Sequence, residues 1–150
     1  MLETVIDEVR SLVRKSGVVI PKGSKLWLSH HYGFEKFRLF GAAIYECWNR
    51  AYCKKILVLL PGQYHPKHRH LKKEETFHVL WGDLGLAVGE EFRMLEPGDF
   101  VNIDLGVYHS FSTSGGCVFE EVSTKHREGD SFYEDKDIDN RTEDRKTFIP

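Results

Sequence analysis

Three histidines and one glutamate of this chain have types and spacings that suit a metal ion. His68 and His70 are two residues apart, so on a β-strand both imidazoles lie on one face, about 6–7 Å apart along the chain. Two imidazoles at that separation can bind one divalent ion at roughly 2.0–2.2 Å each. Glu75 can reach the same ion from the next strand, and His109 from a later one. This donor set suits manganese, iron, cobalt, nickel or zinc, so the sequence predicts a divalent metal site on these four residues.

The strands needed to hold such a site are predicted in the middle of the chain. Short apolar runs rich in strand-forming residues alternate there with turns that contain Gly, Pro or Asp. Short strands at a spacing of about 8–12 residues predict an all-β sandwich or small barrel. The predicted strands are Ala42–Tyr52, Lys55–Leu60, Thr76–Leu80, Gly85–Val88, Phe92–Leu95, Phe100–Ile103, Val107–Thr113 and Cys117–Ser123.

The two ends of the chain differ from this strand-rich middle. Between Thr4 and Lys15 the apolar residues recur on one face of a helix, and Gly17 is a natural helix stop. The C-terminal residues are dense in charge and weak in periodicity, which indicates an extended arm. We therefore predict one domain: an N-terminal helix and arm over residues 1–40 that pack on a barrel of residues 41–125, and a C-terminal arm over residues 126–150.

Two motifs around the predicted metal ligands resemble those of the cupin superfamily. The pattern Gly62-x5-His68-x-His70-x4-Glu75-x6-Gly82 is similar to the first cupin motif. Pro97-Gly98-Asp99, followed by Gly106-x2-His109, is similar to the second. Asp104 and Thr113 depart from the usual second motif, but neither is a ligand position. The resemblance implies an all-β, single-domain cupin (a double-stranded β-helix or jelly-roll barrel) that uses the four predicted metal ligands.

A narrower resemblance points to cupins that act on sugars. The runs Leu60–His70, Lys73–Leu80, Phe119–Thr124 and Asp130–Asp135 resemble the D-lyxose-isomerase-type cupins. The ending Arg145-Lys-Thr-Phe resembles the cupin domains fused to sialic-acid-synthase-like enzymes. These likenesses imply a ketol-isomerase that uses a divalent metal ion, with Mn(2+) favoured over Zn(2+), Fe(2+), Co(2+) or Ni(2+), or a sugar-binding relative of such an enzyme.

A ketol-isomerase needs a general base beside the metal to move a proton between two carbons. Glu120 and Glu121 are adjacent on one predicted strand, so their side chains point to opposite faces. A two-residue hairpin loop before this strand would turn Glu120 toward the metal, whereas a three-residue loop over Ser114–Gly116 would turn Glu121 there. We favour Glu120 as the catalytic base. The alternative is that both acids form ion pairs at the edges of the barrel.

Several other polar residues are candidates for contact with a sugar. Lys67 and Lys72 belong to a basic patch that could attract a phosphate or a sugar-acid carboxylate. The alternative is that these lysines only solvate the end of a strand, which would give the same sequence pattern. Tyr108 and Tyr133 could offer hydroxyl groups. We take Lys67, Lys72 and Tyr108 as the substrate-binding candidates.

Three functions remain open at this point. The first is a metal-dependent aldose–ketose isomerase that acts on an open-chain sugar. The second is a non-catalytic sugar-binding or regulatory cupin of a nonulosonate (sialic-acid-like) pathway. The third is an iron-dependent cupin dioxygenase, which would use the same ligand set. We favour the isomerase, because an inward glutamate near the metal suits proton transfer.

The composition excludes other classes of protein. The chain of 150 residues is 41% hydrophobic and 29% charged, as an average soluble protein is. A net charge of −2 gives no basic footprint for nucleic acid, and no apolar run approaches the roughly 20 residues of a membrane helix. Acidic residues near the N-terminus do not suit a signal peptide, and three scattered cysteines indicate thiols in a reducing compartment. We expect a cytoplasmic homodimer that binds a small sugar or sugar derivative, without nucleic-acid or membrane partners.

Overall fold

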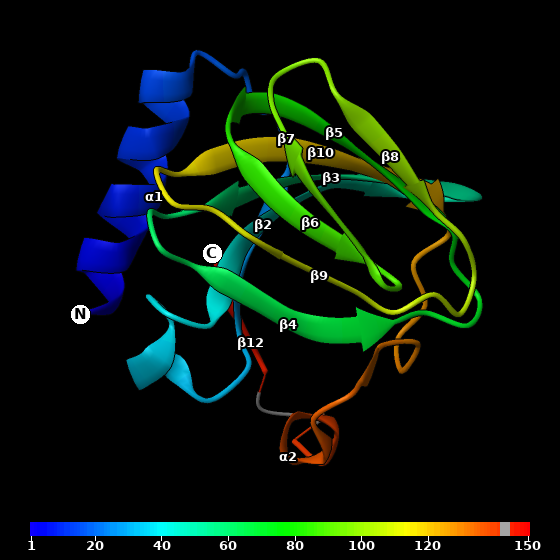
Figure 1. Ribbon diagram of the computed structural model, residues 1–150. Helices are drawn as coiled ribbons and strands as arrows, with labels where there is room; N and C mark the ends of the chain where they lie inside the picture. Colours follow the sequence, from blue (N-terminus) through cyan, green and yellow to red (C-terminus); the bar gives the residue numbers. More distant parts are fainter. Residues whose placement is uncertain (142–144) are drawn as a thin grey trace.

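The strands form two antiparallel sheets that face each other in a computed structural model that describes residues 1–141 and 145–150 (Figure 1). The larger sheet has the strand order β12-β1-β2-β3-β10-β5-β8, and the smaller has the order β11-β4-β9-β6-β7. The larger sheet consists of β1 (Lys25–His30), β2 (Gly41–Asn49), β3 (Tyr52–Leu59), β5 (Glu75–Gly82), β8 (Phe100–Ile103), β10 (Cys117–Thr124) and β12 (Lys146–Ile149). The smaller sheet consists of β4 (Tyr64–Arg69), β6 (Leu84–Val88), β7 (Glu91–Leu95), β9 (His109–Ser112) and β11 (Phe132–Tyr133).

Within residues 1–141 and 145–150, three short or terminal helices complete the fold. They are α1 (Leu2–Ser16), the 3-10 helix η1 (Phe34–Lys36) and α2 (Lys136–Asp139). A mostly β, two-sheet architecture with an N-terminal helix confirms the fold class predicted from the sequence.

The helix α1 covers the outer face of the larger sheet (Figure 1). Its apolar stripe of Val5, Val9 and Leu12 is buried, and it packs in one cluster with Val58 of β3. The helix ends where the sequence predicts, because Gly17 takes the left-handed conformation (φ 73°) and its N–H donates to the carbonyl of Arg14. Amphipathic spacing and a glycine stop are both local signals, so this element was predictable from its own residues.

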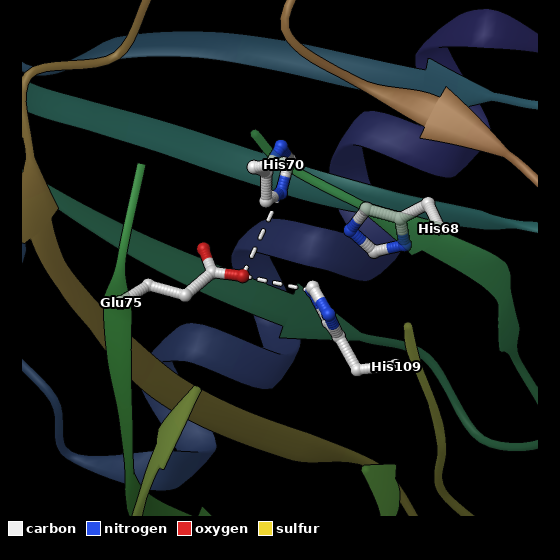
Figure 2. A group of neighbouring side chains, drawn as sticks. All are labelled: His68, His70, Glu75 and His109. Atoms are coloured by element: carbon white, nitrogen blue, oxygen red, sulfur yellow. Dashed lines mark ion pairs between the residues drawn. The ribbon is translucent and has the colours of Figure 1, made fainter. Parts of the chain in front are cut away.

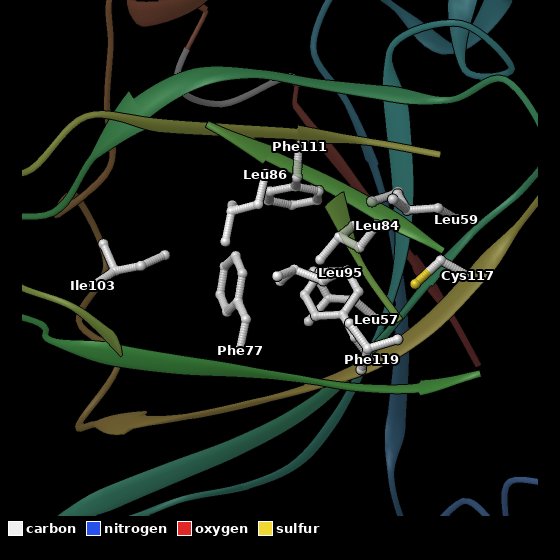
Figure 3. Packing of buried hydrophobic residues seen from close by; sticks show 12 residues of the cluster. Leu57, Leu59, Phe77, Leu84, Leu86, Leu95, Ile103, Phe111, Cys117 and Phe119 are labelled. Carbon is white, nitrogen blue, oxygen red and sulfur yellow. The ribbon is translucent and has the colours of Figure 1, made fainter. Parts of the chain in front are cut away.

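Aromatic side chains fill the space between the two sheets (Figure 3). The rings of Phe77 and Phe111 each pack against Phe119, with centroids 5.0 and 5.2 Å apart. This layer also borders the histidines, since Phe111 stacks on His65 at 4.5 Å and Phe77 lies 5.9 Å from His109. The apolar core therefore forms a rigid floor under the metal-ligand candidates.

Both ends of the chain add strands to the larger sheet. The strand β1 pairs with β2 on one side and with β12 on the other. Leu26 and Leu28 face the α1 side of the sheet, whereas Trp27 and Ser29 face the interior and line a cavity there. Residues before 41 and after 125 thus help to enclose the interior of the barrel, beyond the packing role expected of two arms.

Two further observations concern membrane-spanning helices and the cysteine thiols. No helix within the described ranges is long and apolar enough to cross a membrane. The thiols of Cys47, Cys53 and Cys117 are free. Burial raises the pKa of the Cys117 thiol to about 12, so this thiol is unreactive at neutral pH.

Candidate metal centre and substrate cavity

The structure brings the four predicted metal ligands together at one end of the barrel (Figure 2). His68 lies on β4 directly opposite His109 of β9, while His70 follows the end of β4 and Glu75 begins β5. All four side chains are buried, and one donor atom from each lies within 4.8 Å of the others. Four donors from the two sheets and from the end of β4 thus lie close together.

Backbone carbonyls fix the orientation of all three imidazoles. The Nδ1 atoms of His68, His70 and His109 lie 3.0, 2.8 and 3.0 Å from the carbonyl oxygens of Pro66, Asp130 and Val107. A carbonyl only accepts hydrogen bonds, so each Nδ1 must carry the proton and donate. In a neutral ring, the lone pair is then on Nε2, which leaves that atom free to bind a metal.

The protonation states also suit metal binding. Burial lowers the pKa of His70 to about 4 and holds the pKa of His68 well below its usual value. Burial alone would raise the pKa of Glu75, but the nearby ammonium group of Lys73 acts against burial and is the largest of the influences that hold that pKa low. At neutral pH His68 and His70 are therefore neutral and Glu75 is ionised, the forms that a divalent ion requires.

The contacts around Glu75 fit a bound cation. Its Oε1 lies 2.8 Å from Nε2 of His109 and 3.6 Å from Nε2 of His70 (Figure 2). Within the described chain, both Glu75 oxygens and the His109 Nε2 are buried without a hydrogen bond of regular geometry. With a proton on Nδ1, a neutral His109 and the carboxylate would face each other as two acceptors. A divalent ion between them would satisfy both, so the residues present fit such an ion.

The two acidic candidates on β10 face opposite sides of the larger sheet. Glu121 is buried and shares the inner face with Phe119. Glu120 lies on the outer face, where its carboxylate is 3.2 Å from Nζ of Lys54 and 2.8 Å from Nδ1 of His78. The preference for Glu120 as the inward acid was therefore wrong. The hairpin argument fails because β9 and β10 do not pair with each other but belong to different sheets.

Lys73 connects the inward acid to the metal-ligand group. Its Nζ lies 3.1 Å from Oε2 of Glu121 and 3.4 Å from Oε2 of Glu75. Burial lowers the pKa of Lys73, but these two carboxylates outweigh burial and raise the pKa above its ordinary value. The lysine is therefore a permanent cation that compensates both acids.

A cavity of about 730 Å³ adjoins the metal-ligand group. It lies between the inner faces of β1, β2 and β3 and the C-terminal segment. Ser131 and Tyr133 line it and also touch the ligands: the Ser131 hydroxyl is 3.4 Å from Nδ1 of His70, and the Tyr133 ring is 5.3 Å from that of His68. A space of this size holds a small organic molecule beside the metal-ligand group.

The predicted substrate contacts do not line this cavity. Lys67 pairs with Glu134 at 3.3 Å, Lys72 is exposed, and the ring of Tyr108 lies under the guanidinium of Arg69. Lys67 points away from the interior because alternation along β4 gives the inward position to His68. Lys72 and Tyr108 lie in the segments that precede β5 and β9. Their assignment as substrate-binding residues is thus at odds with the structure, whereas Tyr133, the other tyrosine considered, does line the cavity.

Sequence reasoning missed most of the residues that do line the cavity. Lys55, His126 and Lys146 come from three separate segments of the chain. Lys55 and His126 belong to no motif, and Lys146 was noted only as part of the ending Arg145-Lys-Thr-Phe. His126 and Lys146 lie in the segment that was predicted to be an arm. The pairing of β3 with β10 brings His126 to Lys55, and the pairing of β1 with β12 adds Lys146. These pairings are long-range, so no signal in the sequence assigned the three residues to one site.

Comparisons with known proteins agree with this fold. Residues 55–123 match the cupin domain family. A D-lyxose ketol-isomerase of a Thermofilum species is 28% identical to this chain over 60% of it. That match covers 66% of the relative, so the chain spans just under two thirds of the relative's length.

Two solved structures resemble the chain over nearly all of its length. The L-ribose isomerase of Geodermatophilus obscurus superposes with a TM-score of 0.76, covers 93% of each chain and is 16% identical. The Cellulomonas parahominis L-ribose isomerase with L-ribose superposes with a TM-score of 0.75, covers 91% of this chain and 92% of its own, and is 15% identical. At these identities the likeness establishes a shared fold over nearly the whole chain.

Proposed function

We propose that this chain, whose fold is that of the cupins, is a metal-dependent ketol-isomerase that interconverts an open-chain aldose and ketose. The observation that carries the proposal is the buried Glu121 carboxylate, which one lysine connects to a group of metal donors beside a cavity. A binding site alone needs no second buried carboxylate there, whereas proton transfer between carbons does. The relation to a protein named D-lyxose ketol-isomerase supports this choice of reaction.

His68, His70, Glu75 and His109 would hold the metal ion, for which we propose Mn(2+). When bound, a divalent ion supplies a Lewis acid for the carbonyl and the neighbouring hydroxyl oxygen of the sugar. The protein's contribution is to hold the three imidazoles as neutral donors through Pro66, Asp130 and Val107. These bonds keep the donor geometry fixed before any substrate arrives.

Glu121 would act as the general base. Its carboxylate takes the proton from one carbon of the sugar and returns it to the adjacent carbon, while a proton moves between the two oxygens, so the sugar is isomerised without net gain or loss. Lys73 holds this carboxylate in place from 3.1 Å and balances its charge. The aromatic floor of Phe77 and Phe111 excludes water from beneath the reacting carbons.

The decisive experiment compares two neighbouring acids. Wild-type protein loaded with Mn(2+) is incubated with a panel of aldopentoses and aldohexoses, and ketose formation is measured. Glu121→Gln should lower kcat by roughly 10²–10⁴-fold, the usual contribution of a general base. Glu120→Gln is the matched control, because its carboxylate faces outward, and its kcat should stay close to wild type. Metal content, measured by elemental mass spectrometry, should equal one ion per chain in all three proteins.

Other results would favour the alternative functions. A protein that binds sugars and metal but converts none of them would be a non-catalytic sugar-binding cupin. Purification with iron and uptake of oxygen with an organic substrate would indicate a dioxygenase. The cavity argues against the dioxygenase, because charged side chains such as Lys55 and Glu46 line it rather than apolar groups alone.

We also propose that the protein is a homodimer. The strands β7 and β8 are edge strands of the two sheets, and they carry the exposed apolar side chains Phe92, Met94 and Phe100. Open edges with apolar residues favour pairing with another chain. Light scattering after size-exclusion chromatography tests this, and a monomeric mass at micromolar concentration would rule it out.

A further inference from the structure

A group of basic side chains lines the cavity next to the metal-ligand group. Lys55 comes from the inner face of β3, and Arg145 and Lys146 come from the start of β12. His126 lies among them in the segment after β10. These four residues, called the basic wall below, come from three different parts of the chain and meet only in the folded protein.

Lys55 is the buried member of the basic wall. Its side chain is buried and only 6% of the residue is exposed. Its Nζ lies 3.2 Å from Nδ1 of His126. Burial, together with the neighbouring lysines, lowers the pKa of His126 to about 2, so the imidazole is neutral and accepts a hydrogen bond from the ammonium group. The nearest polar partner of this buried lysine is therefore an uncharged ring.

The contrast with Lys73 shows what Lys55 lacks. Both lysines are almost fully buried, but Lys73 has two carboxylate oxygens at 3.1 and 3.4 Å. In the parts of the chain that the structure describes, Lys55 has no carboxylate within the 4.0 Å of an ion pair. A buried cation without an anion is costly. Burial and the charge of Lys73 lower the pKa of Lys55, and the more distant carboxylates of Glu121 and Glu75 oppose this shift only in part.

Arg145 and Lys146 extend the same pattern. The Arg145 guanidinium lies 4.8 Å above the ring of Tyr133, and no carboxylate of the described ranges forms an ion pair with either basic residue. Lys146 as a whole is exposed, but it lines the cavity, and desolvation of its ammonium group, with the charge of Lys55 second, lowers its pKa to about 8. The basic wall thus gathers several cations that repel one another.

The acids that line the cavity do not balance these cations. The Glu128 side chain is 97% exposed, and its carboxylate lies 4.0 Å from Nε2 of His126, the uncharged member of the basic wall. Asp139 accepts a hydrogen bond from the Tyr133 N–H and pairs with Lys136 at 3.6 Å. Glu46 is opposite Lys55 in the strand register but forms no ion pair with it. Glu121 is also opposite Lys55, on the other neighbouring strand, but its carboxylate forms its ion pair with Lys73. None of these acids forms an ion pair with Lys55, Arg145 or Lys146, so the charge of these three basic residues is available to a ligand.

We propose that the basic wall binds an anionic group, a phosphate or a carboxylate, carried by the sugar whose carbonyl end reaches the metal-ligand group. Lys55, Arg145 and Lys146 donate to the anion, and His126 orients Lys55. This inference rests on the proposed function for the identity of the ligand as a substrate. It assigns the substrate class as charged sugars, either sugar phosphates or sugar acids. Binding of the anion itself does not depend on turnover.

Calorimetric titration of the Mn(2+)-loaded protein with three probes tests the proposal. The probes are ribose 5-phosphate, glucuronate and the neutral sugar lyxose. At least one of the two anionic probes should bind 10-fold or more tightly than lyxose, and the better of the two identifies the anion as phosphate or carboxylate. Raising the salt concentration should reduce this preference. Equal affinity for all three probes would overturn the proposal.

Two variants connect the preference to the basic wall. Lys55→Met and, separately, Lys146→Met should each lower affinity for the preferred anionic probe by about 10-fold and leave lyxose affinity unchanged. Lys54→Met is the matched control, because Lys54 is the next residue on β3 and pairs with Glu120 on the outer face. Anion preference that survives both basic-wall variants would place the anion elsewhere, for instance on the metal. Because Lys146 is on an accessible strand end, its variant keeps the test open if Lys55→Met does not fold.

The test also separates this inference from the proposed function. Tight binding of an anionic sugar without any ketose formation would sustain the basic wall as an anion site and reject the isomerase. Conversion of neutral sugars without anion preference would sustain the isomerase and reject the anion site.

Discussion

Glu75 and Glu121 share one buried ammonium group, that of Lys73, which lies 3.4 and 3.1 Å from their carboxylates. One acid belongs to the metal-donor group and the other is the inward acid of β10. Their strands, β5 and β10, are neighbours in the larger sheet. The proposed base and a proposed metal ligand are therefore positioned by the same lysine, and a change at Lys73 should affect both.

Replacing Lys73 by Met should strongly destabilise the protein. The substitution removes the cation between two buried carboxylates, and breaking a buried ion pair by removing one partner costs about 3–5 kcal/mol. Urea denaturation at pH 7 measures the loss. Lys72→Met is the control, because this neighbouring side chain is exposed and its removal should cost less than about 0.5 kcal/mol. Similar losses in both variants would mean that Lys73 has no special electrostatic role.

Metal binding should stabilise the fold through the four donors. Adding Mn(2+) at 100 times its dissociation constant to protein treated with a chelator should add about 2.7 kcal/mol, which is an increase in Tm of roughly 5–10 °C for a chain of this size. Glu75→Gln should abolish this increase, since it removes the only anionic donor of the group. His78→Ala should keep it, because His78 lies on the outer face with Glu120. An equal increase in wild type and Glu75→Gln would show that manganese binds elsewhere.

The position of the metal donors was predictable because each depends on local information. His68 and His70 are two residues apart, so an extended chain places them on one face. Glu75 and His109 then follow at the spacings of the two cupin motifs, each after a turn. The strand positions themselves followed from apolar runs between Gly and Pro turns, which is why most predicted strands lie close to those observed. The structure accordingly brings together all four residues that the sequence singled out.

The side of β10 that faces inward was not predictable in the same way. Choosing between Glu120 and Glu121 required knowing which strand β10 pairs with, and we assumed the preceding one. The chain instead crosses from the smaller sheet to the larger after β9, and β10 pairs with β3 and β5. The basic wall was hidden for a similar reason, because Lys55 and Lys146 meet only through long-range strand pairing.

Gly82, the last residue of the first cupin motif, should tolerate no side chain. It has a φ of +83°, and a Cβ placed there would collide with the backbone carbonyl of Gly116. Gly82→Ala should therefore add a steric cost, typically about 1–3 kcal/mol, to the roughly 1–2 kcal/mol of the left-handed backbone. Gly98→Ala is the matched control, since Gly98 has a φ of +97° with open space around its Cβ position. Thermal or urea denaturation compares the two, and equal losses would show that the contact with Gly116 relaxes without cost.

Acid should destabilise the protein partly through His31, a buried histidine outside the metal-donor group. Its Nδ1 donates to the carbonyl of Phe40, and Ser29 lies 3.3 Å from its Nε2, so the ring is neutral in the fold. Burial lowers its pKa from 6.5 to about 3. Between those two values the unfolded chain binds a proton that the folded protein does not, so stability must fall as the pH falls from about 6.5 toward 3.

The variant His31→Gln isolates this contribution. It should be less stable than wild type at pH 7, because the glutamine packs less well in a fully buried site. Between pH 6.5 and 4.5, however, the stability of the variant should fall less steeply than that of wild type. The difference between the two slopes should be at most about 1.4 kcal/mol per pH unit, the value for one proton. Urea denaturation of chelator-treated protein across this range gives both slopes. The removal of metal matters, because His68 and His70 would otherwise titrate with the ion as well as with the fold. Identical slopes in wild type and His31→Gln would mean that the folded protein can protonate His31 without unfolding. A histidine lowers stability in acid only if it stays neutral in the folded protein and binds a proton in the unfolded chain.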